Sequence, residues 1–177
     1  MDPIIANASG LVLACVFAPA ALHKWRHGEE FSRVVADYAI VPAPAGAPLV
    51  RILPVLEFSA ALGLLDPPLA TAAAALAAML LLVYTAAILF NLARDHRISD
   101  CGCGGHTQSL SAWLLLRNGV LLVLAFAAGA GRIERQLDWL DCSITLLAAI
   151  AGSLCYYIFN QLLANLDRLK PLRSGHA

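Results

Sequence analysis

Long apolar runs separated by short polar stretches form the main pattern of this chain. Four of the runs each hold roughly the 20 mostly apolar residues that a membrane-spanning helix needs. These runs are residues 4–22, 69–92, 110–130 and 142–163. A fifth run, residues 49–65, is interrupted by a proline and a glutamate, but it can still cross if the Arg51 side chain reaches back to the interface. The pattern therefore predicts five membrane-spanning helices.

The residues between these runs predict how the helices are connected. Residues 27–41 have the polar and apolar positions of an amphipathic helix that lies on the membrane surface. Pro67-Pro68 predicts a tight connection between the second and third spans. Lipid offers no hydrogen-bond partner to a free backbone N–H or C=O group, so helices are the favoured spanning element. We expect an all-α, polytopic transmembrane helical bundle in which residues 1–177 form a single integral membrane domain.

The composition favours the same class of protein. Hydrophobic residues make up 60% of the 177-residue chain and charged residues 14%, whereas soluble domains carry about 25% charge. The formal net charge is zero, and the scattered Lys and Arg residues form no basic stripe of the kind that binds nucleic acid. The chain opens Met1-Asp2-Pro3, without the basic start of a signal peptide, so we expect the first helix to be retained.

The positions of lysine and arginine predict the orientation of the bundle, because short cytoplasmic loops are enriched in these residues. With five crossings, the first loop, the third loop and the C-terminal tail lie on one side of the membrane. They hold Lys24, Arg26, Arg33, Arg51, Arg94, Arg97, Arg168, Lys170 and Arg173, whereas the opposite side holds Arg132 and Arg135. The rule therefore places the C-terminus and the loop around Cys101 in the cytoplasm.

The strongest chemical signal is Cys101-Gly102-Cys103-Gly104-Gly105, in the polar stretch before the fourth span. Two thiols one residue apart can close and open a strained disulfide, and the glycines supply the backbone freedom that this needs. We interpret Cys101 and Cys103 as the catalytic pair of a thiol–disulfide oxidoreductase. A structural or inert pair is one alternative, and a zinc or copper site that includes His106 is another. No clear second Cys/His pair completes a standard metal site, so no metal is assigned.

Two charged residues are predicted to lie inside the membrane near this loop. Glu57 and Arg117 fall about 9 and about 10 Å below the same membrane face, at the helical rise of 1.5 Å per residue. An isolated charge in the bilayer is costly, so we expect them to pair, directly or through Asn118 or water. Such a pair would shape a polar pocket, and a nearby cation would favour the thiolate. The alternative is structural, with Arg117 reaching to the interface and Glu57 fixing helix packing.

Four other residues carry weaker signals. His23 and Lys24 end the first span, where a basic pair is most often an interface anchor, but His23 could also carry protons. Cys15 and Cys155 lie at similar depth in their spans, and lone cysteines in apolar helices are usually small core residues. The alternative is that these two cysteines touch and relay a redox change through the bundle.

Several of these stretches carry a family resemblance. They are Ala21-Leu22-His23-Lys24, the run from Arg51 through Pro54 to Glu57, Asp100-Cys101-Gly102-Cys103-Gly104, and Trp113 followed by Leu116-Arg117-Asn118. Together they resemble the MauE family of DoxX-like membrane proteins, which is named for methylamine utilisation. The match covers roughly residues 15–125, and Gly105 departs from it where the family pattern has an aromatic residue. The resemblance implies a DoxX-like four-helix core with a fifth C-terminal helix.

The resemblance also implies a function. Such proteins are bacterial inner-membrane proteins associated with maturation of the methylamine dehydrogenase small subunit, a client with many disulfides, alongside the thioredoxin-like partner MauD. Our first hypothesis is a membrane oxidoreductase in which Cys101 or Cys103 attacks a partner disulfide and the other cysteine resolves the mixed disulfide. Electrons then pass to quinone or come from a cytoplasmic thioredoxin. The second hypothesis is a non-enzymatic scaffold for partner and client, and the third is a metal-handling membrane protein.

Overall fold

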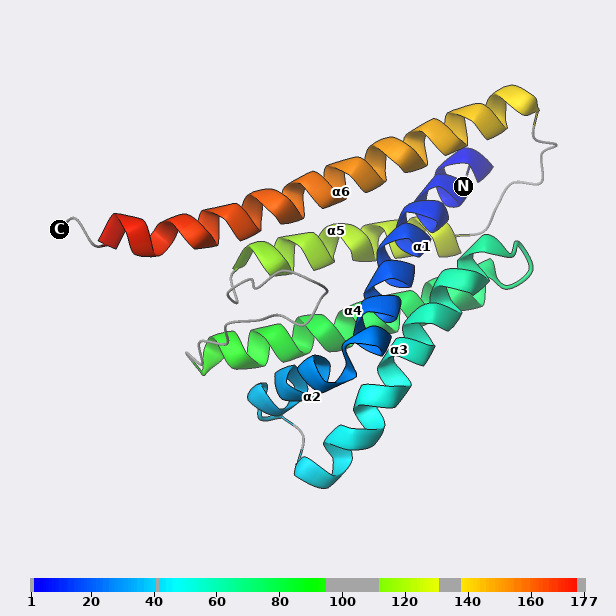
Figure 1. Ribbon diagram of the computed structural model, residues 1–177. Helices are drawn as coiled ribbons and strands as arrows, with labels where there is room; N and C mark the ends of the chain where they lie inside the picture. The colour runs from blue at the N-terminus through cyan, green and yellow to red at the C-terminus, as the bar shows by residue number, and fades with distance from the viewer. Residues whose placement is uncertain (1, 41, 95–111, 131–137, 175–177) are drawn as a thin grey trace.

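The computed structural model describes residues 2–40, 42–94, 112–130 and 138–174, and every element in this part of the chain is an α-helix (Figure 1). The helices are α1 (Pro3–Arg26), α2 (Gly28–Asp37), α3 (Ala43–Leu65), α4 (Ala70–Ala93), α5 (Ala112–Gly129) and α6 (Trp139–Ser174). The predicted all-α fold of a polytopic membrane protein is confirmed. Each of the five predicted spans corresponds to one helix, and the predicted surface segment corresponds to α2.

Within the described residues, four helices are long and apolar enough to cross a membrane. The spanning segments are Pro3–Arg26 of α1, Gly46–Leu65 of α3, Ala70–Ala93 of α4 and Trp139–Asn165 of α6. The apolar part of α5, Trp113–Gly129, is shorter, and 18 residues of α5 extend for about 27 Å. A length of this order approaches the thickness of a hydrocarbon core, which is about 30 Å. α5 thus remains the predicted fifth span.

Local sequence signals explain where the first helices begin and turn. The Asp2 carboxylate caps α1 by accepting a hydrogen bond from the Ile4 N–H at 2.9 Å, and Pro3 stands at the first helical position, where no N–H is needed. α3 ends before Asp66, whose carbonyl accepts from the Leu69 N–H at 3.0 Å. The Pro67-Pro68 connection therefore forms the tight turn that the sequence predicts.

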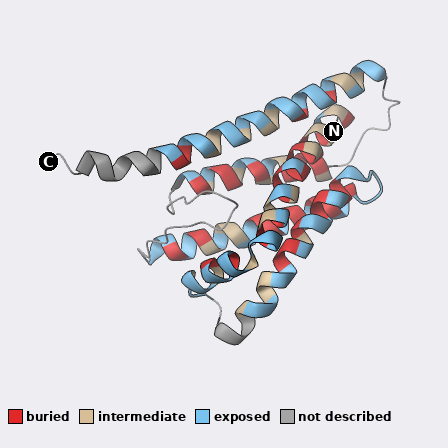
Figure 2. Ribbon diagram, in the orientation of Figure 1, coloured by how far each residue is buried: buried red, intermediate tan, exposed pale blue. Residues whose placement is uncertain are grey.

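α1 is the central helix, and it packs against α3, α5 and α6 (Figure 1). α4 packs against α3 and α5, and the short helix α2 lies against α3 with Phe31 and Val34 buried. The core is rich in alanine, which lets the helices approach closely. Large apolar side chains remain exposed on the outer faces, most of all along α6 (Figure 2). Such a surface is typical of helices that face lipid.

The directions of the helices decide which helix ends lie at the same end of the bundle. α1 and α6 run parallel, because Gly152 of α6 lies against Val12 while the Tyr157 hydroxyl further along α6 bonds to Cys15. The C-terminal end of α4 and the first turn of α5 lie at the end of the bundle where α1 finishes and α2 lies (Figure 1). The sequence that contains Cys101 and Cys103 connects these two helix ends.

Candidate functional site

A buried ion pair links the end of α1 to the middle of α3. The Lys24 ammonium bonds to Oε1 of Glu57, and the two side chains are 4% and 1% exposed. The Tyr84 hydroxyl of α4 donates to the same carboxylate oxygen at 2.6 Å, and Lys24 Nζ lies 3.4 Å from the Tyr84 oxygen. Three helices thus contribute one residue each to a compact group, which we call the Lys24 cluster.

Aromatic rings surround the cation of the Lys24 cluster. Lys24 Nζ lies 5.3 Å from the centre of the Phe31 ring and 4.9 Å from the centre of the Tyr84 ring, within the range of a cation–π attraction. Phe31 belongs to α2, so the surface helix covers the cluster. Among the described residues, Glu57 Oε2 has no hydrogen-bond partner, and the atom is inaccessible to solvent. The cluster therefore holds an acceptor that no described donor satisfies.

A second polar group connects α4, α5 and α6. Arg117 Nη1 donates to Oδ1 of Asn160 at 3.1 Å, and Nη2 lies 3.4 Å from Oδ1 of Asn118. The Asn118 amide in turn donates to the Thr85 hydroxyl at 3.3 Å. We call these four residues the Arg117 network. Because Tyr84 and Thr85 are consecutive, the Lys24 cluster and the Arg117 network lie next to each other along α4.

The expected direct pair between Glu57 and Arg117 is wrong. Glu57 takes its cation from Lys24, whereas Arg117 bonds to Asn160 and Asn118. The prediction rested on depth alone, and depth does not say which face of a helix a side chain occupies. The glutamate faces α1 and α4, and the arginine faces α6. Asn118 joins Arg117 as expected, but it bonds onward to Thr85 rather than to the carboxylate.

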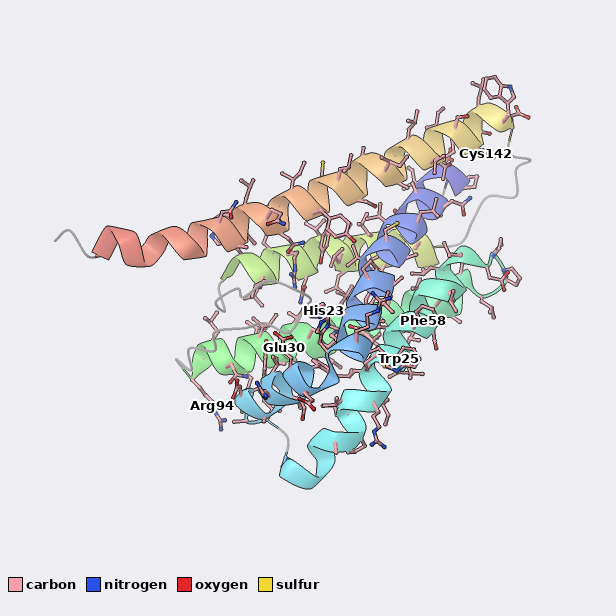
Figure 3. All side chains as sticks on the ribbon, in the orientation of Figure 1. His23, Trp25, Glu30, Phe58, Arg94 and Cys142 are labelled. Atoms are coloured by element: carbon pink, nitrogen blue, oxygen red, sulfur yellow. The ribbon has the colours of Figure 1, made fainter. Side chains whose placement is uncertain are left out.

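His23 and Lys24 are neighbours in sequence but have different surroundings. Lys24 is buried rather than anchored at the interface, because α2 and α3 cover the end of α1. His23 is half-buried, and its ring stacks on that of His27 with centroids 4.5 Å apart. His27 Nδ1 lies 3.2 Å from the His23 carbonyl oxygen. Figure 3 places His23 at the same end of the bundle as Glu30 and Arg94.

The cysteines divide into two groups. Cys101 and Cys103 lie outside the described residues, as does His106. Cys15, Cys142 and Cys155 are free and exposed. The expectation that Cys15 and Cys155 are buried core residues is therefore wrong, since both side chains are exposed.

No disulfide joins the described cysteines, but the helices that carry Cys15 and Cys155 do meet. The Tyr157 hydroxyl donates to the Cys15 carbonyl oxygen at 2.9 Å. Among the residues that the structure describes, no group of three His, Cys, Asp or Glu side chains is arranged to hold a metal ion.

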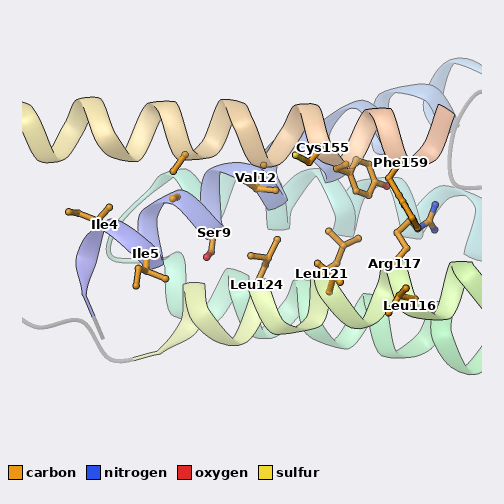
Figure 4. Close-up of a pocket in the computed structure, with 15 residues that line it drawn as sticks. Ile4, Ile5, Ser9, Val12, Leu116, Arg117, Leu121, Leu124, Cys155 and Phe159 are labelled. Atoms are coloured by element: carbon orange, nitrogen blue, oxygen red, sulfur yellow. The ribbon is translucent and has the colours of Figure 1, made fainter. Parts of the chain in front are cut away.

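An apolar groove of about 670 Å³ lies between α1, α5 and α6 (Figure 4). Its walls include Val12, Leu121 and Phe159, and its few polar groups include Ser9 and Arg117. Cys155 also lines the groove. The hydrogen bond between Arg117 and Asn160 joins α5 to α6 at one end of this groove.

Sequence reasoning missed Tyr84, Thr85 and Asn160. All three lie in helices that are otherwise strongly apolar, so their signal was a polar side chain inside a predicted span. Polar residues inside spans usually face the bundle interior or a cavity. That rule was applied to the charged residues and would have found these three as well.

Residues 2–131 match the family described as methylamine utilisation protein MauE. This match includes α1 to α5, the Lys24 cluster and the sequence around Cys101. The chain belongs to the MauE family. Its α6 lies beyond the matched residues, but full-length relatives extend across it.

Three MauE proteins show how far the similarity reaches. The MauE protein of Paracoccus denitrificans is 39% identical over 169 residues, which cover 94% of this chain and 91% of that protein. The MauE protein of Methylophilus methylotrophus is 39% identical over 88% of this chain and 84% of its own length. The MauE protein of Methylorubrum extorquens is 35% identical over 86% of this chain and 88% of its own length. No solved structure matches the chain.

Proposed function

We propose that this protein is a membrane thiol–disulfide oxidoreductase of methylamine utilisation, and that Cys101 and Cys103 are its catalytic pair. The observation that carries the proposal is the Cys101-Gly102-Cys103 sequence between α4 and α5, two apolar helices that pack against each other. The ionisable Lys24 cluster is buried in the same bundle. The three relatives named above are methylamine utilisation proteins, which supports the pathway.

The proposed reaction is an exchange between this pair and a partner disulfide. One cysteine thiolate attacks the partner disulfide, forms a mixed disulfide and releases one partner thiol. The other cysteine then attacks the mixed disulfide, so that Cys101–Cys103 is oxidised and the partner dithiol is released. Two electrons and two protons pass from the pair to the partner. The reverse sequence oxidises the partner, and the two reduction potentials set the direction.

The proposed partner is a thioredoxin-like protein of the MauD type, and the proposed client is a disulfide-rich protein such as the methylamine dehydrogenase small subunit. A thioredoxin fold carries its own exchangeable dithiol, which matches the chemistry of a two-cysteine loop. The bundle would hold the exchange at the surface of the bacterial inner membrane. The charge distribution favours the cytoplasmic face for the Cys101 loop.

The decisive experiment compares cysteine variants in a methylotrophic host that lacks its own MauE protein. We expect the double variant Cys101→Ser/Cys103→Ser to abolish client maturation and growth on methylamine. Cys142→Ser is the matched control, because Cys142 is a free cysteine at the opposite end of the bundle from Arg94 (Figure 3), and it should leave growth unchanged. One of the single variants Cys101→Ser and Cys103→Ser should accumulate a mixed disulfide with the partner, and the cysteine that remains in that variant is the attacking one.

Full maturation by the double variant would contradict an oxidoreductase. In that case the protein would act as a scaffold for partner and client, with its helices rather than its thiols as the functional part. The metal-handling alternative predicts bound zinc or copper in the purified protein that is lost on alkylation of the thiols.

A further inference from the structure

The apolar groove between α1, α5 and α6 combines a lining of hydrocarbon side chains with one charged residue (Figure 4). We propose that it binds one anionic phospholipid of the bilayer, whose acyl chain lies along the groove and whose phosphate faces the Arg117 guanidinium. All residues of this site belong to described parts of α1, α5 and α6. The site is separate from the cysteine pair, so it does not depend on the proposed thiol exchange.

The mouth of the groove opens to the outside of the bundle. Ile5, Leu116 and Val120 line the groove and remain 50%, 54% and 54% exposed. They lie in α1, which contains a spanning segment, and in α5, the predicted fifth span. The medium around these helices is hydrocarbon, and an unfilled space of about 670 Å³ would leave its walls without dispersion contacts. Acyl chains of the surrounding bilayer are the material that can fill it.

The packing of three helices forms the groove. α5 and α6 both pack on α1. A Cβ atom at Gly152 of α6 would lie 2.9 Å from Cγ2 of Val12, so α6 touches α1 directly at this level. At one end the hydrogen bond from Arg117 to Asn160 connects α5 to α6. The two helices therefore form the walls of the groove, and α1 lies between them.

The length of the groove fits one acyl chain. α6 lines it from Ala148 to Phe159, a distance of about 16 Å at the helical rise of 1.5 Å per residue. One leaflet contributes about half of a hydrocarbon core that is roughly 30 Å thick. Figure 4 places Ile4 at one end of the groove and Arg117 and Phe159 at the other. The charged end fixes the orientation of the lipid, with its head beside Arg117.

The chemistry of Arg117 suits an anionic head group. Its side chain is 6% exposed and lines the groove, and a guanidinium stays charged at every physiological pH. With five N–H donors, it can bind a phosphate while it also bonds to Asn118 and Asn160. Among the described residues that line the groove, none is acidic. A negatively charged head therefore meets attraction without a competing repulsion.

The position of Arg117 on α5 brings its charge toward the membrane face. Arg117 is the sixth residue of α5, which begins at Ala112, so its backbone lies about 8 Å from the start of the helix. Side chains of a helix point toward its N-terminus, and a long arginine side chain extends further toward the interface. The guanidinium thus approaches the level at which lipid phosphates lie.

The test measures lipid binding to the full chain, purified in detergent and depleted of lipid. Phosphatidylglycerol and phosphatidylcholine with identical acyl chains are added separately, and native mass spectrometry counts the molecules bound per chain. We expect one phosphatidylglycerol to bind with an affinity roughly fivefold higher than that of phosphatidylcholine, the scale of one arginine near an anionic lipid. Phosphatidylglycerol should also raise the midpoint of thermal unfolding, because it binds the folded state.

Two pairs of variants test the two ends of the lipid. Ala148→Phe places a ring in the groove and should abolish the one-to-one binding. Ala151→Phe is its matched control, because Ala151 is also an exposed alanine of α6 but does not line the groove. Arg117→Gln should remove the preference for phosphatidylglycerol while phosphatidylcholine still binds. Arg117→Lys keeps the positive charge and should retain most of the preference.

Several results would overturn the proposal. Equal phosphatidylglycerol binding by Ala148→Phe and Ala151→Phe would mean that the lipid binds elsewhere. Equal affinity of the unsubstituted chain for the two lipids would overturn the role of Arg117, and this measurement decides if Arg117→Gln does not fold. Bound ubiquinone that phosphatidylglycerol does not displace would assign the groove to a prenylated quinone. A dimer that is present in the unsubstituted chain and lost in Ala148→Phe would assign the groove to a second copy.

Discussion

The ammonium of Lys24 and the carboxylate of Glu57 form an ion pair inside the helical bundle, although the residues are 33 positions apart in the sequence. The contact fixes the C-terminal end of α1 against the middle of α3. Both side chains are almost completely buried, at 4% and 1% exposure. A pair of this kind is held by mutual neutralisation, so each partner depends on the other.

Removing one member of this pair should destabilise the protein more than removing both. Glu57→Leu leaves the Lys24 charge buried without its partner and should lower the free energy of unfolding by about 3–5 kcal/mol. The double variant Lys24→Met/Glu57→Leu replaces the pair with apolar side chains of similar size and should lose much less. Thermal unfolding in detergent measures both variants. The single variant Lys24→Met completes the cycle, and a loss in the double variant equal to the sum of the two single losses would show that the pair contributes no coupling.

The sequence predicted the helices well because the signal for a membrane helix is local. Each apolar run is long enough to identify by itself, and α2 was recognised from its amphipathic pattern. The partners of the charged residues were not predictable in the same way. Depth placed Glu57 and Arg117 at one level, but the rotation of each helix about its axis decides which neighbour a side chain meets.

Lys24 shows a second limit of sequence reasoning. It stands at the end of an apolar run, where an interface anchor is the usual interpretation. It is buried because α2 folds back over the end of α1, and this depends on a contact with Phe31 seven positions later. The position of a surface helix on a bundle is a tertiary property. The hydrophobic pattern of α2 predicts its amphipathic nature, but not the residue that it covers.

Close packing of α3 on α4 should make Gly63 intolerant of a side chain. A Cβ atom at Gly63 would lie 2.8 Å from the Ala73 Cβ, which is fixed to the α4 backbone. Gly63→Ala should therefore force the helices apart and cost about 1–3 kcal/mol of unfolding free energy. Gly119→Ala is the matched control, because a Cβ there meets nothing within 4 Å. Equal stability of the two variants in detergent unfolding would contradict this packing.

The hydrogen bond between Arg117 and Asn160 should contribute to holding α6 on the bundle. α6 packs mainly on α1. The hydrogen bond from Arg117 to Asn160 connects α6 to α5 as well. Asn160→Leu removes an acceptor from a buried guanidinium and should cost about 1.5–3 kcal/mol. Asn165→Leu, at an exposed position on the same helix, controls for the change in side-chain hydropathy. The unfolding midpoint in detergent should fall for the first variant and stay constant for the second.

One predicted span, α5, lies between Cys101 and Cys142 in the sequence. The five-span arrangement therefore predicts that these two cysteines react from opposite sides of the membrane. Cys142 is a free cysteine in the first turn of α6, at the opposite end of the bundle from Arg94 (Figure 3). A membrane-impermeant maleimide should label a chain that keeps only Cys142 in intact cells, because the positive-inside rule puts that end in the periplasm. A chain that keeps only Cys101 should react only in inverted vesicles.

Cys155 supplies the control for this labelling experiment. It lies within the spanning segment of α6 and lines the apolar groove between α1, α5 and α6. A chain that keeps only Cys155 should therefore react in neither preparation, because a membrane-impermeant reagent does not enter the apolar interior. Labelling of Cys142 only in inverted vesicles and of Cys101 in intact cells would reverse the orientation and move the proposed thiol exchange to the periplasm. Labelling of both from the same side would mean that α5 does not cross the membrane. Its apolar part, Trp113–Gly129, is shorter than the spanning segments of α1, α3, α4 and α6.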